Sequence, residues 1–458
     1  MKVVYAVAPL GTLFFFLDSS TIPPNDVWWH LRAGDLLRAT HHLTTTDSFS
    51  FTRSGAYWPN QAWLMQLQVS FAHAIGGDAL VLFVNTLFIA AGYALVFVPL
   101  IRRHGARAAA AAMFAGMMIA AENWAVRPQA FSFFAFGALV SSIERHREGH
   151  ARALYFAPVL FLVWANAHAG FVFGLLLLAI YFGGTSIEAK RMDRTLLAIL
   201  VACVVASVIT PLGPSGTIRY FSEFVGSHAS ATLNAEYRGV SITEPDGQAL
   251  ALWCLVLLGA WISARPGLPL DRILTFAAFF CLELWALRNA VWLGLAVMPI
   301  AAEIFDAAEK KRGLDRAGAD SRLDRAIAVF FGIAAIASLP WFRPMLPMPA
   351  SRRDLLSTST PVAAMKFACA NLPDGARVFQ EDRFGVYQIW ACPRLPVFID
   401  TRFELYPVSQ MEDYLAISEG RPESDALLEK YGVTHLFLST ETQAGAITRA
   451  RTSPAWRE

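Results

Sequence analysis

Two residues near the start of the chain, a carboxylate and an imidazole, have types and a spacing that suit chemistry. Asp26 and His30 follow two prolines that break the first apolar segment, and Asn25 or Asp26 can cap a helix that begins there. Residues four apart share one face of a helix, so the two side chains are expected to be neighbours. A carboxylate in this setting suits a general base or a metal ligand. Two tryptophans between them favour a helix at a membrane surface, where such rings collect.

Further polar residues are predicted to gather on the same side of the membrane. Ionisable groups at membrane depth are costly unless they are paired, which makes them candidate functional residues. Arginine can hold a phosphate through two parallel hydrogen bonds. A carboxylate together with arginines therefore fits chemistry on a lipid phosphate. The full set is Asp26, His30, Glu122, Arg127, Gln129, Asn166, His168, Glu236, Arg238, Arg288 and Asn289.

Five of these residues also have a plainer interpretation, which the sequence leaves open. For Asp26 it is helix capping, and for His30 it is a hydrogen bond within its own loop. For His168 it is a hydrogen bond to a neighbouring helix. For Arg127 and Arg288 it is ion pairing with acidic residues of the outer loops. The sequence contains no P-loop, HExxH, GxSxG or CxxC pair, so it gives no support to an ATPase, a zinc protease or a serine hydrolase.

The composition is that of a polytopic α-helical membrane protein. Hydrophobic residues make up 55% of the 458 residues and charged residues only 16%, against roughly 25% charged in soluble domains. The net charge of +2 argues neither for nor against nucleic acid, and no nucleic-acid partner is expected. About eleven crossings are predicted, at residues 3–17, 78–101, 108–121, 129–143, 153–165, 170–186, 195–210, 250–264, 273–287, 289–304 and 326–340.

The basic residues predict the orientation of these crossings. With the N-terminus in the cytoplasm, the inner loops carry more than twice as many Lys and Arg residues as the outer loops. This parity requires 153–184 and 273–304 to be hairpins rather than single crossings. Each limb would span only about 24 Å, less than the roughly 30 Å hydrocarbon core, so the polar tips should be sunken. We therefore expect Asn166 to Ala169 and Arg288-Asn289 to line one cavity with Asp26.

Two domains are predicted, a transmembrane domain at 1–340 and an extracytoplasmic α/β domain at 341–458. The first outer loop, 18–77, should contain helices at 25–39 and 60–75 with an extended segment between them. The tail should contain helices at 361–371, 383–391, 408–418 and 423–431, and strands at 376–380, 396–400 and 433–439. Cys369 and Cys392 could pair if the tail lies outside the cell, and the sequence leaves this open.

An ordered series of short motifs runs along nearly the whole chain and resembles the polytopic C-class glycosyltransferases, the GT-C fold. The resemblance is to bacterial membrane proteins related to dolichyl-phosphate-mannose-type and lipopolysaccharide-core glycosyltransferases. Each motif alone is weak, and their order is specific. The motifs are Asp26–Leu31 with Gly34, Thr46–Thr52, Trp63-Leu64, Arg127–Ser132, Trp164–Phe171, Leu287–Asn289 and Val397–Arg402.

The resemblance implies an enzyme of the bacterial plasma (inner) membrane. It would transfer a sugar from a polyprenyl-phosphate carrier to a saccharide, lipid or protein acceptor on the outer side. Asp26 matches the family's carboxylate in the first outer loop, and it would act as the base or hold Mg²⁺ or Mn²⁺, with His30 assisting. Glu122 is the acidic residue of the next outer loop and the other candidate metal ligand. The expected substrate-binding residues are Arg127, Gln129, Asn166, His168, Glu236, Arg288 and Asn289.

Two positions depart from the family pattern, and two other functions compete. Thr401 stands where related tails have Gly, and Gly385-Val386 where they have a Gly-Gly pair, which weakens the case for sugar binding by the tail. A transporter or flippase of a lipid-linked saccharide would show inverted repeats and broken helices at the midplane, and no repeat is visible. A non-catalytic scaffold of an envelope polysaccharide assembly complex is the third possibility.

Overall fold

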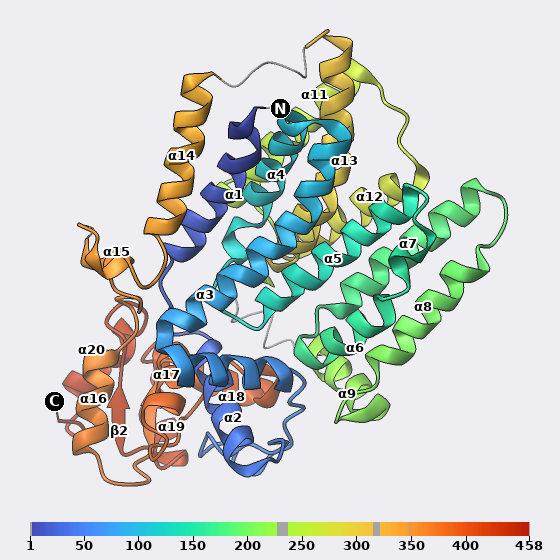
Figure 1. Ribbon diagram of the computed structural model, residues 1–458. Coiled ribbons are helices and arrows are strands. Elements are labelled where there is room, and N and C mark those ends of the chain that lie inside the picture. Colours follow the sequence, from blue (N-terminus) through green and yellow to red (C-terminus); the bar gives the residue numbers. More distant parts are fainter. Residues whose placement is uncertain (1, 227–236, 315–320, 348, 458) are drawn as a thin grey trace. The chain divides into compact units, whose positions relative to one another are not determined.

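The computed structural model describes residues 2–226, 237–314, 321–347 and 349–457 (Figure 1). Two compact units divide the chain. We call the first the helical unit; it comprises Met1–Thr21, Gly76–Pro211 and Glu236–Leu355. We call the second the mixed unit; it comprises Ile22–Ile75, Leu212–Ala235 and Leu356–Glu458. These units divide the chain differently from the predicted domains, because the first loop belongs with the C-terminal segment.

The helical unit is built from long apolar helices. Its 3-10 turns are η1 (Ala121–Asn123), η2 (Ala151–Leu154), η4 (Leu287–Asn289) and η5 (Arg343–Met345). Its helices are α1 (Val3–Asp18), the part of α3 (Trp63–His104) after Gly76, α4 (Ala106–Ala120), α5 (Gln129–Arg147), α6 (Ala157–Ala167), α7 (Phe171–Glu188), α8 (Arg194–Ser207), α11 (Pro245–Ala264), α12 (Leu270–Trp285), α13 (Ala290–Lys311), α14 (Arg322–Ala337) and α15 (Ala350–Arg353).

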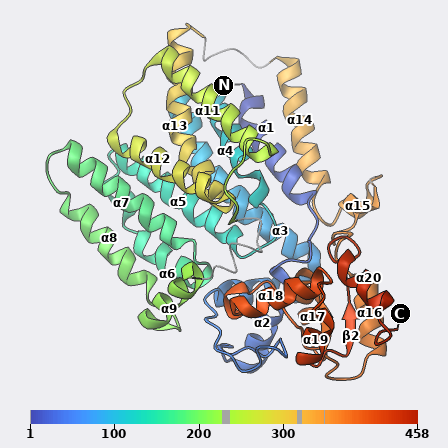
Figure 2. The same ribbon diagram turned by 180° about the vertical axis from the view of Figure 1, so that it is seen from behind.

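Helix α13 lies in the core of this unit, with most of its residues buried. It packs closely on α4 because two glycines face each other. A Cβ atom added to Gly116 would lie 2.3 Å from the Gly294 carbonyl oxygen, so only glycine permits this approach. Helices α7 and α8 lie side by side in both views (Figures 1 and 2).

Each of the eleven predicted apolar segments is helical over most of its length, and these apolar helices indicate a membrane protein. Within the described residues, four helices are long and apolar enough to cross a membrane: Trp63–His104, Phe171–Glu188, Pro245–Ala264 and Leu287–Lys311. Shorter apolar helices lie at Val3–Asp18, Ala106–Ala120, Ala151–Ala167 and Arg194–Ser207. The number of crossings and their orientation stay predictions.

Both predicted hairpins break at their polar residues. Helix α6 ends at Ala167, and the backbone of His168 is extended before α7 begins at Phe171. Ala286 is likewise extended between α12 and η4. Helix α3 breaks at Gly77, whose φ of 60° and ψ of −158° are open to glycine alone. The predicted crossing at 78–101 therefore begins directly after a backbone break.

The mixed unit combines the first loop with the tail. It contains the only sheet in the described part of the chain, in which β1 (Val378–Gln380) and β2 (His435–Phe437) pair in parallel, with Val378 opposite His435. The helices are α2 (Val27–Thr40), the first part of α3, α9 (Gly213–Gly226), α16 (Val362–Asn371), α17 (Asp382–Ala391), α18 (Val408–Ser418), α19 (Ser424–Lys430) and α20 (Ala444–Thr452), with η6 at Phe403–Leu405.

The predicted strand at 396–400 is wrong, because a side chain takes the place of a strand partner there. The Gln380 amide donates to the Ile399 carbonyl at 2.6 Å and accepts from the Phe398 N–H at 3.1 Å. Within 396–400, Val397 alone forms isolated bridges, to Ser50 and to Val378. Helix α20 was also not predicted.

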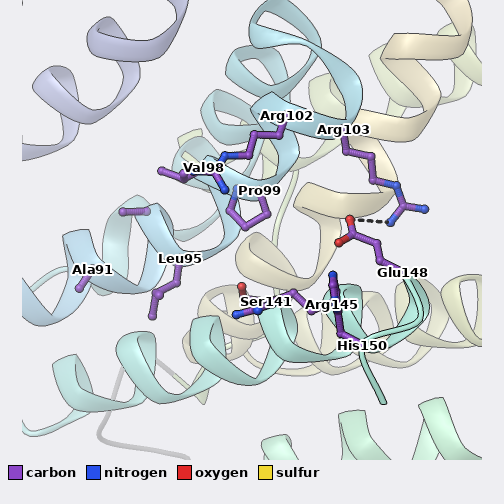
Figure 3. A pocket seen from close by; sticks show the side chains of 11 residues that line it. Ala91, Leu95, Val98, Pro99, Arg102, Arg103, Ser141, Arg145, Glu148 and His150 are labelled. Atoms are coloured by element: carbon purple, nitrogen blue, oxygen red, sulfur yellow. Dashed lines mark ion pairs between the residues drawn. The ribbon is translucent and has the colours of Figure 1, made fainter. Parts of the chain in front are cut away.

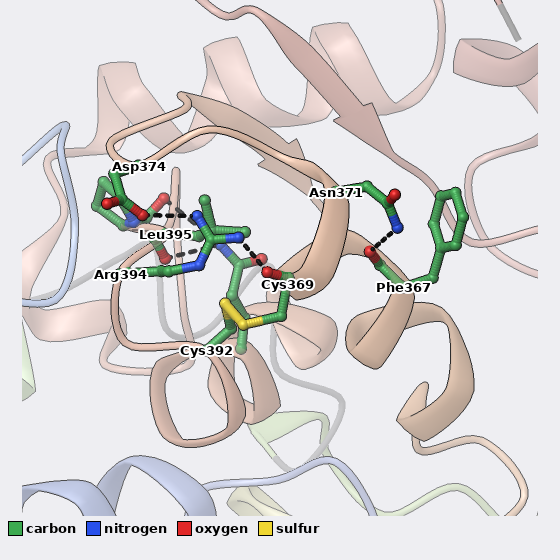
Figure 4. The surroundings of a disulfide bond; sticks show 9 residues. Phe367, Cys369, Asn371, Asp374, Cys392, Arg394 and Leu395 are labelled. Atoms are coloured by element: carbon green, nitrogen blue, oxygen red, sulfur yellow. Dashed lines mark hydrogen bonds and ion pairs between the residues drawn. A yellow bond between two sulfur atoms is a disulfide. The ribbon is translucent and has the colours of Figure 1, made fainter.

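Cys369 and Cys392 form a disulfide that joins α16 to the segment after α17 (Figure 4). Their Cα atoms are 5.7 Å apart. Arg394 donates to the Cys369 carbonyl and pairs with Asp374 at 2.8 Å, so the turn beside the disulfide is also held by its side chains. The pairing that the sequence left open is therefore present.

Candidate active site

Asp26 immediately precedes α2 but does not cap it. Its side chain makes no capping hydrogen bond; the neighbouring Asn25 accepts instead from the Val27 N–H at 3.2 Å. The Asp26 carboxylate accepts a short hydrogen bond from the Thr401 hydroxyl. That hydroxyl in turn accepts from the Trp29 indole N–H at 3.3 Å. The half-buried carboxylate is therefore oriented by a residue of the tail.

His30 is buried one turn further along α2 and is fixed by an amide pair. The Gln66 amide nitrogen lies 3.3 Å from the His30 Nδ1 atom, and Gln66 and Asn60 exchange hydrogen bonds in both directions. An amide N–H can only donate, so Nδ1 is the acceptor and the proton of a neutral ring lies on Nε2. The imidazole is thus held in one tautomer, which is what an assisting residue needs.

The sequence motif around Asp47 and the one around Asp400 meet in a buried charge network. Arg402 donates to Asp47 at 2.7 Å and to Asp400 at 2.6 Å, and all three side chains are fully buried. Tyr406 donates to Asp400 at 2.8 Å. The carboxylates raise the pKa of Arg402 against the effect of burial. Both motifs are visible in the sequence, but nothing in the sequence predicts that they bind each other.

Glu404 is a further acidic residue of this region that sequence reasoning missed. Burial raises the pKa of its carboxyl to about 7; Arg402 opposes this rise, and the Asp400 and Asp26 carboxylates add to it. Glu404 therefore lies within electrostatic range of Asp26. The one indication in the sequence that Glu404 belongs to this region was its place in the aromatic-rich run directly after Arg402.

The described residues contain no group of three or more His, Cys, Asp or Glu side chains that could hold a metal ion. Asp26 and Glu404 are two carboxylates that act on each other, and Mg²⁺ is often held by one or two carboxylates with the remaining oxygens from a phosphate. The side chain of Glu122, the other predicted ligand, lies outside the described residues, as does Glu236.

In the helical unit, two of the predicted arginines lie in turns beside helix ends. Arg127 lies just before α5, and its backbone N–H donates to Asn85 at 3.4 Å. Arg288 lies in η4, donates to the Tyr237 hydroxyl and stacks over that ring at 4.6 Å. Both are half-buried.

His168 lies at the first hairpin tip and is held by a chain of hydrogen bonds. The Trp164 indole donates to Ser132 at 2.8 Å, and Ser132 lies 2.8 Å from His168 Nδ1. The Gly170 N–H also donates to Nδ1, at 3.0 Å. Nδ1 therefore accepts and Nε2–H is left as the donor. Arg288 is close enough to act electrostatically on His168, so the two tips approach each other.

The remaining predicted substrate-binding residues are largely buried in the helical unit. The Asn166 amide donates to Leu162 and Ile209 carbonyls at 2.8 and 2.9 Å, and the Asn289 amide donates to the Leu282 carbonyl at 2.9 Å. Gln129 is buried in the first turn of α5. These amides tie helix ends together. Asp26 belongs to the mixed unit and the tips to the helical unit, so the shared cavity stays a prediction.

Neither family models nor curated proteins give a match to this sequence. Solved structures do match. The Archaeoglobus fulgidus oligosaccharyltransferase tethered to an acceptor peptide with an NVT sequon aligns over 94% of this chain and 69% of its own, with 14% identity and a TM-score of 0.56. The oligosaccharyltransferase AglB of that organism, in complex with an inhibitory peptide and a dolichol-phosphate, aligns over 95% and 70%, with 13% identity and a TM-score of 0.57.

ArnT from Cupriavidus metallidurans, bound to undecaprenyl phosphate, aligns over 97% of this chain and 94% of its own at 12% identity, with a TM-score of 0.49. At these identities the comparison concerns the fold. The match to the two oligosaccharyltransferase structures confirms the resemblance that the motifs indicated: this chain has a GT-C-like fold.

Proposed function

We propose that the chain is a membrane glycosyltransferase that transfers a sugar from a polyprenyl-phosphate carrier to an acceptor on the outer side of the bacterial plasma membrane. The observation that carries this proposal is the state of Asp26. Its carboxylate is not used as a helix cap but is oriented by Thr401 and Trp29. The GT-C-like fold supports the same reaction class.

Asp26 is the proposed general base. It would take the proton of the acceptor hydroxyl or amide as that group attacks the anomeric carbon, while the bond from this carbon to the phosphate oxygen breaks. His30, whose Nδ1 accepts from Gln66 and whose proton lies on Nε2, would orient the acceptor by donating a hydrogen bond. Saccharide, lipid and protein acceptors are all compatible with these roles.

Arg127, His168 and Arg288 are the proposed phosphate-binding residues. The leaving polyprenyl phosphate gains negative charge as the sugar departs, and fixed positive groups and N–H donors stabilise that charge. The two arginines carry permanent charge, and the Ser132 and Gly170 contacts aim the Nε2–H of His168 as a donor. Dolichol-phosphate in the AglB complex is a ligand of the same chemical class.

The alternative role of Asp26 in this proposal is to hold a divalent cation, Mg²⁺ or Mn²⁺. Asp26 and Glu404 are the described carboxylates that would hold it, with phosphate oxygens of the donor completing its coordination. The cation would supply positive charge at the departing phosphate.

The outer location of the tail rests on the charge pattern and on the disulfide. Disulfides persist in oxidising compartments such as the periplasm and are rare in the cytosol. The Cys369–Cys392 bond therefore supports a tail outside the cytoplasm, as the positive-inside rule predicts.

Binding of a lipid phosphate tests the proposal directly. The purified protein in detergent would be titrated with undecaprenyl phosphate, with thermal stabilisation as the readout. Wild type should be stabilised, and Arg288→Gln should bind at least about tenfold more weakly, because a charged hydrogen bond contributes roughly 1.5–3 kcal/mol. Arg194→Gln, at an exposed arginine that begins α8, is the matched control and should bind like wild type. Equal binding by Arg288→Gln and wild type would exclude the proposed role of Arg288.

A further inference from the structure

A groove with a basic end lies between α3 and α5 in the helical unit (Figure 3). Its volume is about 820 Å³. One part of its lining is apolar, and the other part carries Arg102, Arg145 and His150. None of these residues belongs to the proposed glycosyl-transfer chemistry.

The apolar wall follows one face of α3. Ala91, Leu95, Val98 and Arg102 are spaced by four, three and four residues, which places them in a row along the helix. The row is about 16 Å long at 1.5 Å per residue. Leu95 and Val98 are 36% and 41% exposed, so the wall is open to the surroundings. A ligand in this groove would have a long apolar part and a polar end.

The polar end of the groove carries uncompensated positive charge. Arg103 is occupied by Glu144 at 3.1 Å and Glu148 at 3.8 Å, a pairing that Figure 3 shows in part. Arg102 and Arg145 are exposed, and no ion pair joins either of them to another residue in the part of the chain that the structure describes. The acidic residue of the groove is therefore already neutralised, and two guanidinium groups are left to bind an anion.

A second hollow continues the basic end. Its volume is about 610 Å³, and it shares Arg145 and His150 with the groove. It adds Arg152 to the cationic lining and Phe156 to the apolar lining. The positive surface therefore extends around the end of α5 rather than stopping at a single side chain.

We propose that this groove binds an anionic phospholipid, with the lipid phosphate between Arg102 and Arg145 and an acyl chain along Ala91, Leu95 and Val98. Acidic lipid head groups bind in basic pockets between transmembrane helices. One guanidinium group can donate two parallel hydrogen bonds to the oxygens of a phosphate. A phospholipid is complementary to both parts of the groove. Its phosphate diester suits the two arginines, and its hydrocarbon chain suits the apolar wall.

This site is separate from the proposed donor-binding residues. Arg127 precedes α5 and Arg145 lies near its other end, 18 residues further along the sequence. At 1.5 Å per residue the two positions are about 27 Å apart along the helix. One phosphate group cannot contact both, so a lipid in this groove is not the sugar donor.

The test compares lipid binding by matched variants. Delipidated full-length protein would be titrated with phosphatidylglycerol and with phosphatidylcholine, and bound lipid counted by native mass spectrometry. Wild type should prefer phosphatidylglycerol. The double variant Arg102→Gln/Arg145→Gln should bind it about thirtyfold more weakly, at about 1 kcal/mol for each arginine near an acidic lipid. Arg191→Gln/Arg194→Gln removes two exposed arginines outside both hollows and should bind like wild type.

Three results would overturn the proposal. The first is a double variant that unfolds at the same temperature as wild type in phosphatidylcholine and still binds phosphatidylglycerol equally well. The second is a wild-type protein with no preference between the two lipids. The third is displacement of bound phosphatidylglycerol by undecaprenyl phosphate or by inorganic phosphate, which would assign the groove to a different phosphate ligand.

Discussion

At the scale of single residues, a substitution of Asp26 can distinguish a catalytic role of this carboxylate from a structural one. Asp26→Asn keeps the size of the side chain and can still accept from Thr401, but it removes the charge and the ability to take a proton. We expect normal expression and a loss of at least about 10² in the rate of sugar transfer, the low end for removal of a general base. The measurement is release of undecaprenyl phosphate from a labelled undecaprenyl-phosphate sugar.

Asp35→Asn is the control for this variant. Asp35 is on the same helix and accepts from the Ser70 hydroxyl at 2.6 Å, which an asparagine oxygen can also do. It should keep the activity of wild type. Equal losses in both variants would mean that α2 is easily perturbed, and full activity of Asp26→Asn would remove the base from the proposal.

Glu404 makes a pH-dependent contribution to stability. Its folded pKa of about 7 is above the ordinary value of 4.5, so between these values the folded state binds more protons than the unfolded state. The stability that the protonated Glu404 carboxyl contributes to the folded state is therefore fully present below about pH 4.5. It is lost as the pH rises through about 7. Glu404→Gln should therefore remove part of the fall in melting temperature from about pH 5 to about pH 8. Glu412→Gln, at an exposed glutamate of α18, should melt like wild type at each pH.

Arg402 joins the first loop to the tail through its buried ion pairs with Asp47 and Asp400. Replacing it with Met leaves Asp47 and Asp400 buried without their cation. Removing one partner of a buried pair costs about 3–5 kcal/mol. The variant should open to protease between the first loop and the tail at concentrations that leave wild type intact. Arg421→Met breaks an exposed pair with Glu419 and should leave the digestion pattern unchanged; identical digestion of Arg402→Met would contradict this role of Arg402.

At the scale of elements, the position of α2 depends on Gly34. A Cβ atom there would lie 2.1 Å from the Gln66 carbonyl oxygen, so α2 and the first part of α3 could not keep their spacing. Gly34→Ala should destabilise the protein by about 1–3 kcal/mol, the usual cost of overpacking. Gly183→Ala in α7 meets no atom within 4 Å and is the matched control. Thermal unfolding in detergent separates the two, and equal melting temperatures would show that the helices adjust to the added methyl group.

Local sequence patterns predicted most of the helices, but they could not predict contacts between distant segments. Apolar runs of helical length predicted the helices of the helical unit, because periodicity and breaking prolines or glycines are local properties. The predicted strand at 396–400 is wrong because the side chain of Gln380, 18 and 19 residues earlier in the sequence, bonds to the backbone of Phe398 and Ile399. The pairing of Asp47 with Arg402 joins residues 355 apart, and the hold of Thr401 on Asp26 joins residues 375 apart. No pattern in one sequence encodes such pairings.

At the scale of the whole molecule, the prediction to test is that the tail lies on the outer side of the membrane. The positive-inside rule places it outside, and the disulfide supports this. Glu423→Cys introduces an exposed thiol just before α19, in a background where Cys203, Cys254 and Cys281 are replaced by Ser. A membrane-impermeant maleimide should label it in spheroplasts without permeabilisation. Arg191→Cys, in a predicted inner loop, should be labelled only after permeabilisation. The reverse pattern in properly inserted protein would invert the topology and place Asp26 and its acceptor chemistry on the cytoplasmic side.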